Sequence, residues 1–261
     1  MKTVKLIVGL AAPILIAWVV RSKIRSEHVT HAPILATYTK LAYKPIVKWA
    51  ANRVLKGRNL DRTDPHQGRF TEFDVSRILD RTWHTYDELA PAAGVEELKT
   101  LGNRQNVLLG VATYALYQAL LAEGIQKEYC TELLTDVVWK GYETWIFLPR
   151  AMARLLAREP QKQMEMMLRM FLRYPFSRPG YDWKFQPESD RVTLDFYRCP
   201  VHDYFKARGE EEVFRNSWCT LDFALAQVMT KDGRYERPHT LSAGDDRCDM
   251  KWYVKARETQ G

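Results

Sequence analysis

The stretch RVTLDFYRCPVHDYFKARGEEEVFRNSWCTLDFALAQVM, residues 191–229, decides the fold class because its apolar periodicity changes along its length. Its beginning alternates Val192, Leu194 and Phe196 with polar residues, which is typical of a half-buried strand. The remainder has helical spacing on both sides of Gly209 and predicts two helices. The sequence therefore predicts an α+β fold in this half of the chain.

Helical spacing dominates the chain before this stretch. Residues 71–156 contain three successive helical patterns, of which the second, NVLLGVATYALYQALLAEG, predicts a buried helix. Residues 174–188 are rich in Pro, Gly and aromatic residues, and residues 235–255 resemble a hairpin with alternating apolar residues. We expect a helical bundle followed by a small antiparallel sheet with packed helices.

The N-terminal run LIVGLAAPILIAWVV, residues 6–20, contains no charged residue and lies between basic residues. With Val4 and the snorkelling side chains of Lys5 and Arg21, its length approaches the lower limit of about 17 residues for a membrane-spanning helix. A cleavable signal peptide would have small residues after the run, whereas bulky and then basic residues follow here. We therefore expect an uncleaved single-pass transmembrane anchor over residues 1–24.

Positive charge is concentrated around and after this run. The chain has a formal net charge of +7. Residues 1–62 hold about +10, so the rest of the chain is slightly acidic. This distribution favours membrane lipid, and not nucleic acid, as the partner of the basic region. The basic flank after the run predicts a globular domain that faces the cytoplasm, where four cysteines need not pair.

The basic region continues as PILATYTKLAYKPIVKWAANRVLKG, residues 33–57. Its interleaved apolar, aromatic and lysine residues suit a helix that lies on the membrane surface and breaks near Pro45. A helix packed on the globular domain or on a partner subunit explains the same pattern. We divide the chain into the anchor, a basic amphipathic juxtamembrane arm over residues 25–62, and a globular α+β domain over residues 63–261.

Four side chains that can support nucleophilic catalysis fall within the stretch quoted first: Cys199, His202, Cys219 and Asp222. If Cys199 lies where the strand ends and the helix begins, the helix N-terminus and the imidazole of His202 both favour the thiolate. Cys219 and Asp222 share a helix face. From that face Asp222 can orient His202 or a water molecule as a general base. These four residues are the candidate catalytic cluster.

Two other interpretations stay open. The first is a Zn or Fe site formed by one histidine and three cysteines, namely Cys199, His202, Cys219 and Cys248. A Cys-x-x-His pair without a second closely spaced pair is weak evidence for it, and we expect no cofactor otherwise. In the second interpretation, the cysteines are buried core residues and Asp245 and Asp246 only form a turn.

Further residues are candidates for ligand contact. Asn106 lies at the start of the buried helix pattern, where it contacts a ligand or caps the helix. Asp245, Asp246 and Cys248 belong to the C-terminal block GDDRC. We expect these four residues to line a small-molecule pocket with the candidate catalytic cluster.

Three blocks follow the buried helix pattern in the order RCPVHDYF, WCTLDFALA and HTLSAGDDRCDMKW. Together they resemble the L-2-amino-thiazoline-4-carboxylic acid hydrolase-like family over residues 71–254. The ending GDDRCDMKW is also similar to the close of the 4-vinyl reductase-type small-molecule-binding domain. The resemblance to the first family implies an activity that opens a cyclic C=N/C–S heterocycle. The N-terminal anchor is a departure from a soluble metabolic enzyme.

Two functions follow from these observations. The first is a membrane-anchored hydrolase-like enzyme that acts on a small heterocyclic or amide-like C–N/C–S substrate through the Cys/His/Asp cluster. The second is a non-catalytic accessory or ligand-binding subunit of a membrane protein complex. The clustered Cys, His and Asp residues favour the first function, and the anchor with its basic arm favours the second.

Overall fold

The computed structural model describes residues 32–230 and 232–254. The helices of this part are α2 (Ala32–Val54), α3 (Glu72–Leu89), α4 (Leu101–Leu121), α5 (Lys127–Leu156), α6 (Pro160–Arg173), α7 (Pro200–Lys206), α8 (Glu211–Phe214) and α9 (Leu221–Met229). Its strands are β1 (Asp182–Pro187), β2 (Arg191–Arg198), β3 (Arg234–Glu236) and β4 (Cys248–Tyr253). A π-helical turn, η4 (Arg215–Cys219), separates α8 from α9, and the short helix η5 (Leu241–Ala243) lies between β3 and β4.

The strands form one antiparallel sheet with the order β1-β2-β4-β3. β2 and β4 are its central strands, with Leu194 opposite Met250 and Phe196 opposite Cys248. The predicted α+β class, with a helical bundle and a small antiparallel sheet, is therefore confirmed. β1 was not predicted, because its segment is rich in turn-forming residues. It becomes a strand by pairing with β2, where Trp183 lies opposite Phe196.

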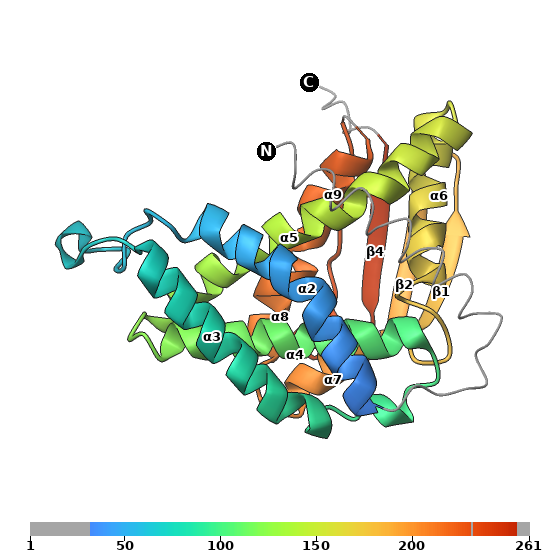
Figure 1. The fold of residues 1–261 in the computed structure, drawn as a ribbon. Helices are drawn as coiled ribbons and strands as arrows, with labels where there is room; N and C mark the ends of the chain where they lie inside the picture. The colour runs from blue at the N-terminus through green and yellow to red at the C-terminus, as the bar shows by residue number, and fades with distance from the viewer. Residues whose placement is uncertain (1–31, 231, 255–261) are drawn as a thin grey trace.

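Two groups of buried side chains form the core, and Figure 1 shows how the elements that carry them are arranged. The first joins α2, α3, α4, the first half of α5, α7 and α8, and includes Leu108 and Phe205. The second lies between the sheet, α6, α9 and the second half of α5, and includes Met164 and Trp252. Cys199 packs against both groups. The end of β2 therefore lies at the junction of the two cores.

α2 belongs to the first core. Leu35 and Tyr43 are buried, and the Tyr86 hydroxyl of α3 donates a hydrogen bond to the Ala36 carbonyl at 3.1 Å. Of the interpretations left open for this segment, packing on the globular domain is the one that the structure shows for residues 32–54. The predicted break near Pro45 is wrong, since α2 continues through it. Pro45 lies on the exposed side, where water can hydrogen-bond the carbonyl that a proline leaves without a donor.

The predicted anchor, residues 1–24, and the first residues of the predicted arm lie outside the described residues. Among the helices that the structure does describe, none combines the length and the apolar composition needed to cross a membrane. The apolar character of α4 reflects its place inside the bundle, because nearly every residue along it is buried.

Candidate functional site

Cys199 lies where the sequence predicts it, at the end of β2 and directly before α7. It is the N-cap residue of α7, and its Sγ accepts a hydrogen bond from the backbone N–H of His202 at 3.5 Å. Pro200 follows at the first helical position, which its fixed φ angle suits. This strand-to-helix junction places the Cys199 thiol at the boundary between the two cores.

The imidazole of His202 does not pair with this thiol. Its Nδ1 lies 3.5 Å from Asp203 Oδ1, and its ring centroid lies 6.2 Å from that of Phe214. The side chain is 7% exposed, and Nε2 has no hydrogen-bond partner within the described part of the chain. The predicted relay from Cys199 through His202 to Asp222 is therefore not formed. At the third helical position the backbone amide faces the cap, whereas the side chain points outward from the helix axis.

The two other cysteines of this region are connected by hydroxyl groups. Cys219 ends the π-helical turn η4, and its Sγ lies 3.9 Å from Ser242 Oγ. Ser242 Oγ lies 3.2 Å from Thr240 Oγ1, which in turn lies 3.3 Å from Cys248 Sγ. Cys248 Sγ also accepts a hydrogen bond from the Leu241 N–H at 3.4 Å. The segment around η5 thus links the end of η4 to the start of β4.

A carboxylate and a guanidinium lie beside these thiols. Arg237 Nη1 donates to the Cys219 carbonyl at 3.0 Å and to Asp222 Oδ2 at 3.3 Å. The Tyr235 hydroxyl donates to the same oxygen of Asp222 at 3.2 Å and accepts a hydrogen bond from Arg237 at 3.4 Å. The Arg237 side chain is 6% exposed and that of Asp222 is 24% exposed, so this ion pair is largely removed from water. We name five residues the thiol–carboxylate cluster: Cys199, Cys219, Cys248, Asp222 and Arg237.

Burial keeps the thiols of this cluster protonated. It raises the pKa of Cys219 to about 12 and raises the pKa of Cys199 and of Cys248 above the ordinary value. The backbone N–H of His202 only partly opposes this effect at Cys199, and negative charge on Cys219 or Cys248 would raise the pKa of Cys199 further. The thiolate predicted at the start of α7 is therefore wrong for this structure, because desolvation outweighs the helix N-terminus.

Asp222 has a pKa close to neutrality. Burial raises the pKa of Asp222 to about 6, against the opposing effects of the Arg237 charge and the Tyr235 hydroxyl. A carboxyl group with such a pKa exchanges protons near physiological pH, as a general acid or base must. The hydrogen-bond partners of Asp222 are Arg237 and Tyr235, whereas the sequence predicted that Asp222 orients His202 or a water molecule.

Asn106 is connected to the cluster from α4. It lies inside the helix, whose N-cap residue is Thr100, so it is not the cap. Its Nδ2 donates a hydrogen bond to the Tyr181 hydroxyl. Burial raises the pKa of Tyr181, and charge on the neighbouring Cys199 would raise it further. Asn106, which is 3% exposed, therefore reaches Cys199 through Tyr181.

Asp245 and Asp246 form the turn before β4. Asp245 Oδ2 accepts a hydrogen bond from the Thr240 N–H at 2.7 Å. The Asp246 side chain is 79% exposed and pairs with Arg247 at 3.3 Å. Gly244 supplies the left-handed conformation of this turn, with a φ of 96°. Asp245 thus positions the hydroxyl partner of Cys248, and Asp246 points to solvent.

A comparison with protein-family models gives a match to L-2-amino-thiazoline-4-carboxylic acid hydrolase over residues 105–252. The chain belongs to this family. The resemblance that we drew from the three sequence blocks is thereby confirmed, and the matched range contains the whole thiol–carboxylate cluster. The similarity to the 4-vinyl reductase-type domain stays a prediction. No curated protein and no solved structure matches the chain.

The protonated thiols of this L-2-amino-thiazoline-4-carboxylic acid hydrolase family member lead to a first prediction. We expect iodoacetamide to alkylate Cys199 and Cys219 about tenfold or more slowly in the native protein than in guanidinium at about pH 7, because alkylation requires the thiolate. Peptide mass spectrometry measures the rate at each cysteine. Cys130, which is fully buried in α5, is the internal control for slow reaction. Rapid alkylation of native Cys199 would contradict the pKa direction given above.

Metal ligands are not assembled in this hydrolase family member. Residues 32–230 and 232–254 contain no group of three or more His, Cys, Asp or Glu side chains that could hold a metal ion. In the Zn or Fe set weighed from the sequence, the imidazole of His202 is turned toward Asp203.

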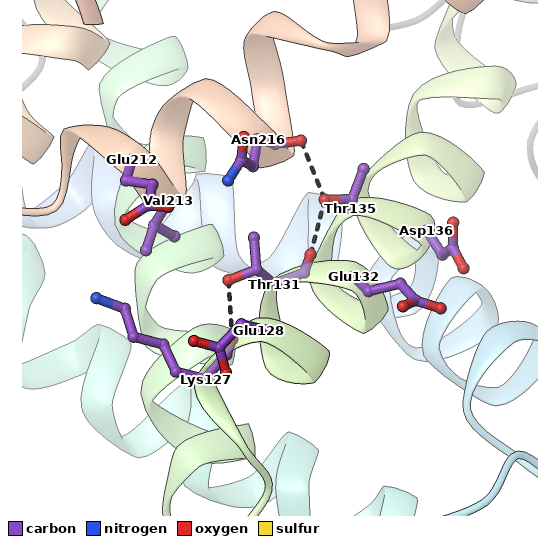
Figure 2. A pocket seen from close by; sticks show the side chains of 9 residues that line it. All are labelled: Lys127, Glu128, Thr131, Glu132, Thr135, Asp136, Glu212, Val213 and Asn216. Carbon is purple, nitrogen blue, oxygen red and sulfur yellow. Dashed lines mark hydrogen bonds between the residues drawn. The ribbon is translucent and has the colours of Figure 1, made fainter. Parts of the chain in front are cut away.

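A separate surface cleft of about 400 Å³ lies between α5 and the segment formed by α8 and η4 (Figure 2). Carboxylates dominate its lining, and some of them are already paired, as Glu132 is with Arg62 at 3.0 Å. The Thr135 hydroxyl donates to the Asn216 carbonyl across the cleft at 3.1 Å. Neither a thiol nor an imidazole lines it. We therefore place the candidate site of this hydrolase family member at the thiol–carboxylate cluster.

Sequence reasoning missed the partners of Asp222. Tyr235 lies in the three-residue strand β3, and Arg237 directly follows it. No sequence pattern distinguishes either residue from other polar surface residues. Thr240 and Ser242 fall within the block HTLSAGDDRCDMKW on which the resemblance rests. That block therefore marked the correct loop of the hydrolase family fold, although the roles of its hydroxyl groups became visible only in the structure.

Proposed function

We propose that this protein hydrolyses a small C–N/C–S heterocycle that carries a carboxylate, and that the thiol–carboxylate cluster is its active site. The family description supplies 2-amino-thiazoline-4-carboxylate as an example of such a substrate. The observation that carries the proposal is the desolvated pair of Asp222 and Arg237 beside the Cys219 thiol. Cys219 and Asp222 both keep part of their surface exposed, which the proposal requires for contact with a small molecule.

Arg237 has donors available for a ligand. Its hydrogen bonds to the described residues all come from Nη1, and its Nε is buried without a partner there. An unsatisfied buried donor costs about 1 to 3 kcal/mol. A guanidinium binds a carboxylate best through two parallel hydrogen bonds. A substrate carboxylate bound by Nε and Nη2 would therefore satisfy Arg237, and we assign it the role of holding the substrate.

Asp222 has the properties of the general base. In its ionised form it accepts a proton from a water molecule, whose oxygen adds to the amidine-like carbon of the heterocycle. The C–S or C–N bond then breaks, and the leaving atom takes the proton back from Asp222. The net change is the addition of one water molecule. Tyr235 and Arg237, which both hydrogen-bond Asp222 Oδ2, keep the carboxylate oriented during this exchange.

A ligand-binding role without turnover is the second candidate function. It is favoured by the raised pKa of Cys199 and of Cys219, which burial causes, since neither thiol is activated as a nucleophile. The orientation of His202 toward Asp203 favours it too. The same cluster would then retain a small carboxylate on Arg237 and leave it unchanged.

Turnover of 2-amino-thiazoline-4-carboxylate by the purified full-length protein tests the proposal. We expect a product one water heavier than the substrate, detected by mass spectrometry. Cys219→Ser should keep kcat/KM within about tenfold of the unchanged protein, because water and not the thiolate attacks the substrate. Cys130→Ser, a matched change in the helical core, should do the same.

Two other outcomes of this assay would contradict the proposal. A loss of about a thousandfold or more in Cys219→Ser, with no loss in Cys130→Ser, would identify Cys219 as the nucleophile. Binding of the substrate by the unchanged protein without conversion would favour the ligand-binding role.

We further propose that the anchor expected over residues 1–24 holds this activity at the cytoplasmic side of a membrane. The charge-free run and its basic flank in the sequence support this proposal. The chemistry of the cluster needs no membrane, so the anchor would determine where the enzyme works. Membrane lipid and other membrane protein subunits are the partners expected from it.

A further inference from the structure

The outer side of α2 exposes apolar side chains. Ile34, Tyr38 and Leu41 are 47%, 62% and 64% exposed and lie opposite the buried side that carries Leu35 and Tyr43. Single exposed apolar residues are ordinary on a protein surface. Three that follow one another at helical spacing form a stripe that is without a partner in the described part of the chain.

The second half of α5 also exposes apolar side chains. Phe147, Met152, Leu155 and Leu156 are 72%, 39%, 86% and 64% exposed. The opposite side of the same segment packs into the second core through Ile146 and Ala153. The segment therefore carries apolar residues on two sides, one of which is buried while the other is exposed.

The exposed apolar side chains of α2 and of α5 lie on two helices that cross. α2 crosses α5 where Ile46 lies against Gly141 (Figure 1). At 3.6 residues per turn, the side chains of Met152 and Leu155 on α5 lie within about 60° of the direction of Gly141, as does Leu156. The side of α5 that α2 covers at the crossing is thus the same side that is exposed to solvent further along α5, toward its C-terminal end. Phe147 lies about 120° from the direction of Gly141 and faces another side of α5. We name the other six exposed side chains the crossing surface: Ile34, Tyr38, Leu41, Met152, Leu155 and Leu156.

The charges at the edge of the crossing surface are positive. Neither residues 32–54 nor residues 144–158 contain an Asp or a Glu. Lys44 of α2 and Arg154 and Arg158 of α5 form no ion pair with a described residue. Apolar side chains bordered by unpaired cations match the boundary between phosphate head groups and acyl chains.

The positive charge around the crossing surface also distinguishes between the possible binding partners of that surface. The apolar run of residues 6–20 has basic residues at both ends, so placing it on the crossing surface would bring like charges together. A second copy bound through the same surface by two-fold symmetry would oppose cation to cation as well. An anionic bilayer instead complements both the apolar side chains and their basic border. We propose that the crossing surface rests on an anionic phospholipid membrane, with α2 and the second half of α5 lying along it.

Hydroxyl-radical footprinting of the full-length chain tests this proposal, because it reports each side chain whatever else holds the protein to the membrane. On vesicles of phosphatidylcholine and phosphatidylserine, oxidation of Leu155 and Leu156 should fall about fivefold or more compared with the vesicle-free protein. Phe73 and Phe223, which are 73% and 48% exposed on other helices, are the internal controls and should keep their rates. Peptide mass spectrometry measures the rates.

Two results would overturn the proposal. Equal oxidation of Leu155 and Leu156 with and without bound vesicles would mean that another surface meets the lipid. Protection before vesicles are added would mean that this chain or a second copy already covers the surface.

A double variant provides an independent test of the same proposal. Leu155→Glu combined with Leu156→Glu places two carboxylates in the crossing surface, and should abolish the vesicle-dependent protection of Tyr38 on α2. Phe73→Glu, an exposed change outside the surface, should leave that protection intact. Because all three positions are exposed, circular dichroism is expected to be unchanged. Full protection of Tyr38 in the double variant would mean that α2 and α5 do not share one membrane-bound surface, and would overturn the proposal.

Discussion

Replacing Arg237 by methionine is expected to lower the free energy of unfolding by about 3 to 5 kcal/mol at neutral pH. The methionine fills much of the same space but leaves the Asp222 carboxylate without its counter-charge in a largely desolvated place. It also removes the donor that the Cys219 carbonyl accepts at 3.0 Å. Urea unfolding, followed by tryptophan fluorescence, measures the change.

The control for this variant is an ion pair in contact with water. Arg58 pairs with Asp136 at 2.6 Å, with side chains 37% and 42% exposed. Arg58→Met should therefore cost no more than about 1 kcal/mol. The Arg237→Met defect should also shrink as the pH falls toward about 6, because loss of Arg237 raises the pKa of Asp222 and the carboxyl of the variant is then neutral already at a higher pH. Equal losses for the two variants would mean that burial of the cluster does not determine its energetics.

The position of the candidate site could be predicted from local rules. Alternating residues predicted β2, and the proline after Cys199 begins a helix at its preferred first position. Both rules depend on residues adjacent in sequence, so the junction that positions Cys199 was predictable. The packing that places this junction between the two cores was not predictable, because it depends on α5, a helix that contributes side chains to both cores.

The chemistry of the site was predicted less well, for a physical reason. The helix N-terminus at Cys199 is a local feature and favours a thiolate, whereas desolvation depends on every element packed around the sulfur. The desolvation is the larger effect, so the pKa of Cys199 rises. The same limitation applies to Arg237, which looks like a surface residue in the sequence and is 6% exposed in the fold.

α2 illustrates a further limit of sequence patterns. Its mixed apolar and basic residues suited a helix on a membrane and a helix packed on the domain equally well. The structure buries Leu35 and Tyr43 and leaves Tyr38 and Leu41 outside, so packing accounts for one side of the helix and the proposed membrane contact would use another. The sequence pattern predicts which residues of a helix are apolar. Only the packed fold shows which of those residues are buried and which are exposed to solvent.

Substitution of Asp222 by asparagine has the other large expected effect. If Asp222 is the general base, Asp222→Asn should lower kcat by about a hundredfold to ten-thousandfold while leaving the fold intact, because the amide has a similar shape but cannot accept the proton. Activity of the unchanged protein should rise with pH through about 6, where Asp222 becomes ionised. The rise should be absent from any residual activity of the variant. Steady-state rates between about pH 4.5 and 8 measure both effects. Asp136→Asn, which changes an exposed carboxylate on α5, should keep both the rate and the pH profile.

Stability should show the opposite pH dependence, and this tests independently whether Asp222 is the group that titrates near pH 6. Burial raises the pKa of Asp222 from 3.8 to about 6 in the folded protein. The folded state therefore binds this proton more tightly than the unfolded state does. The contribution of Asp222 to stability is fully present below about pH 4 and is lost as the pH rises through about 6, a change of about 3 kcal/mol. Asp222→Asn lacks this contribution at every pH, so its free energy of unfolding relative to the unchanged protein should rise by that amount between these pH values. A constant difference across the range would mean that Asp222 is ionised throughout, held by Arg237, and would remove it as the group that titrates in the activity profile.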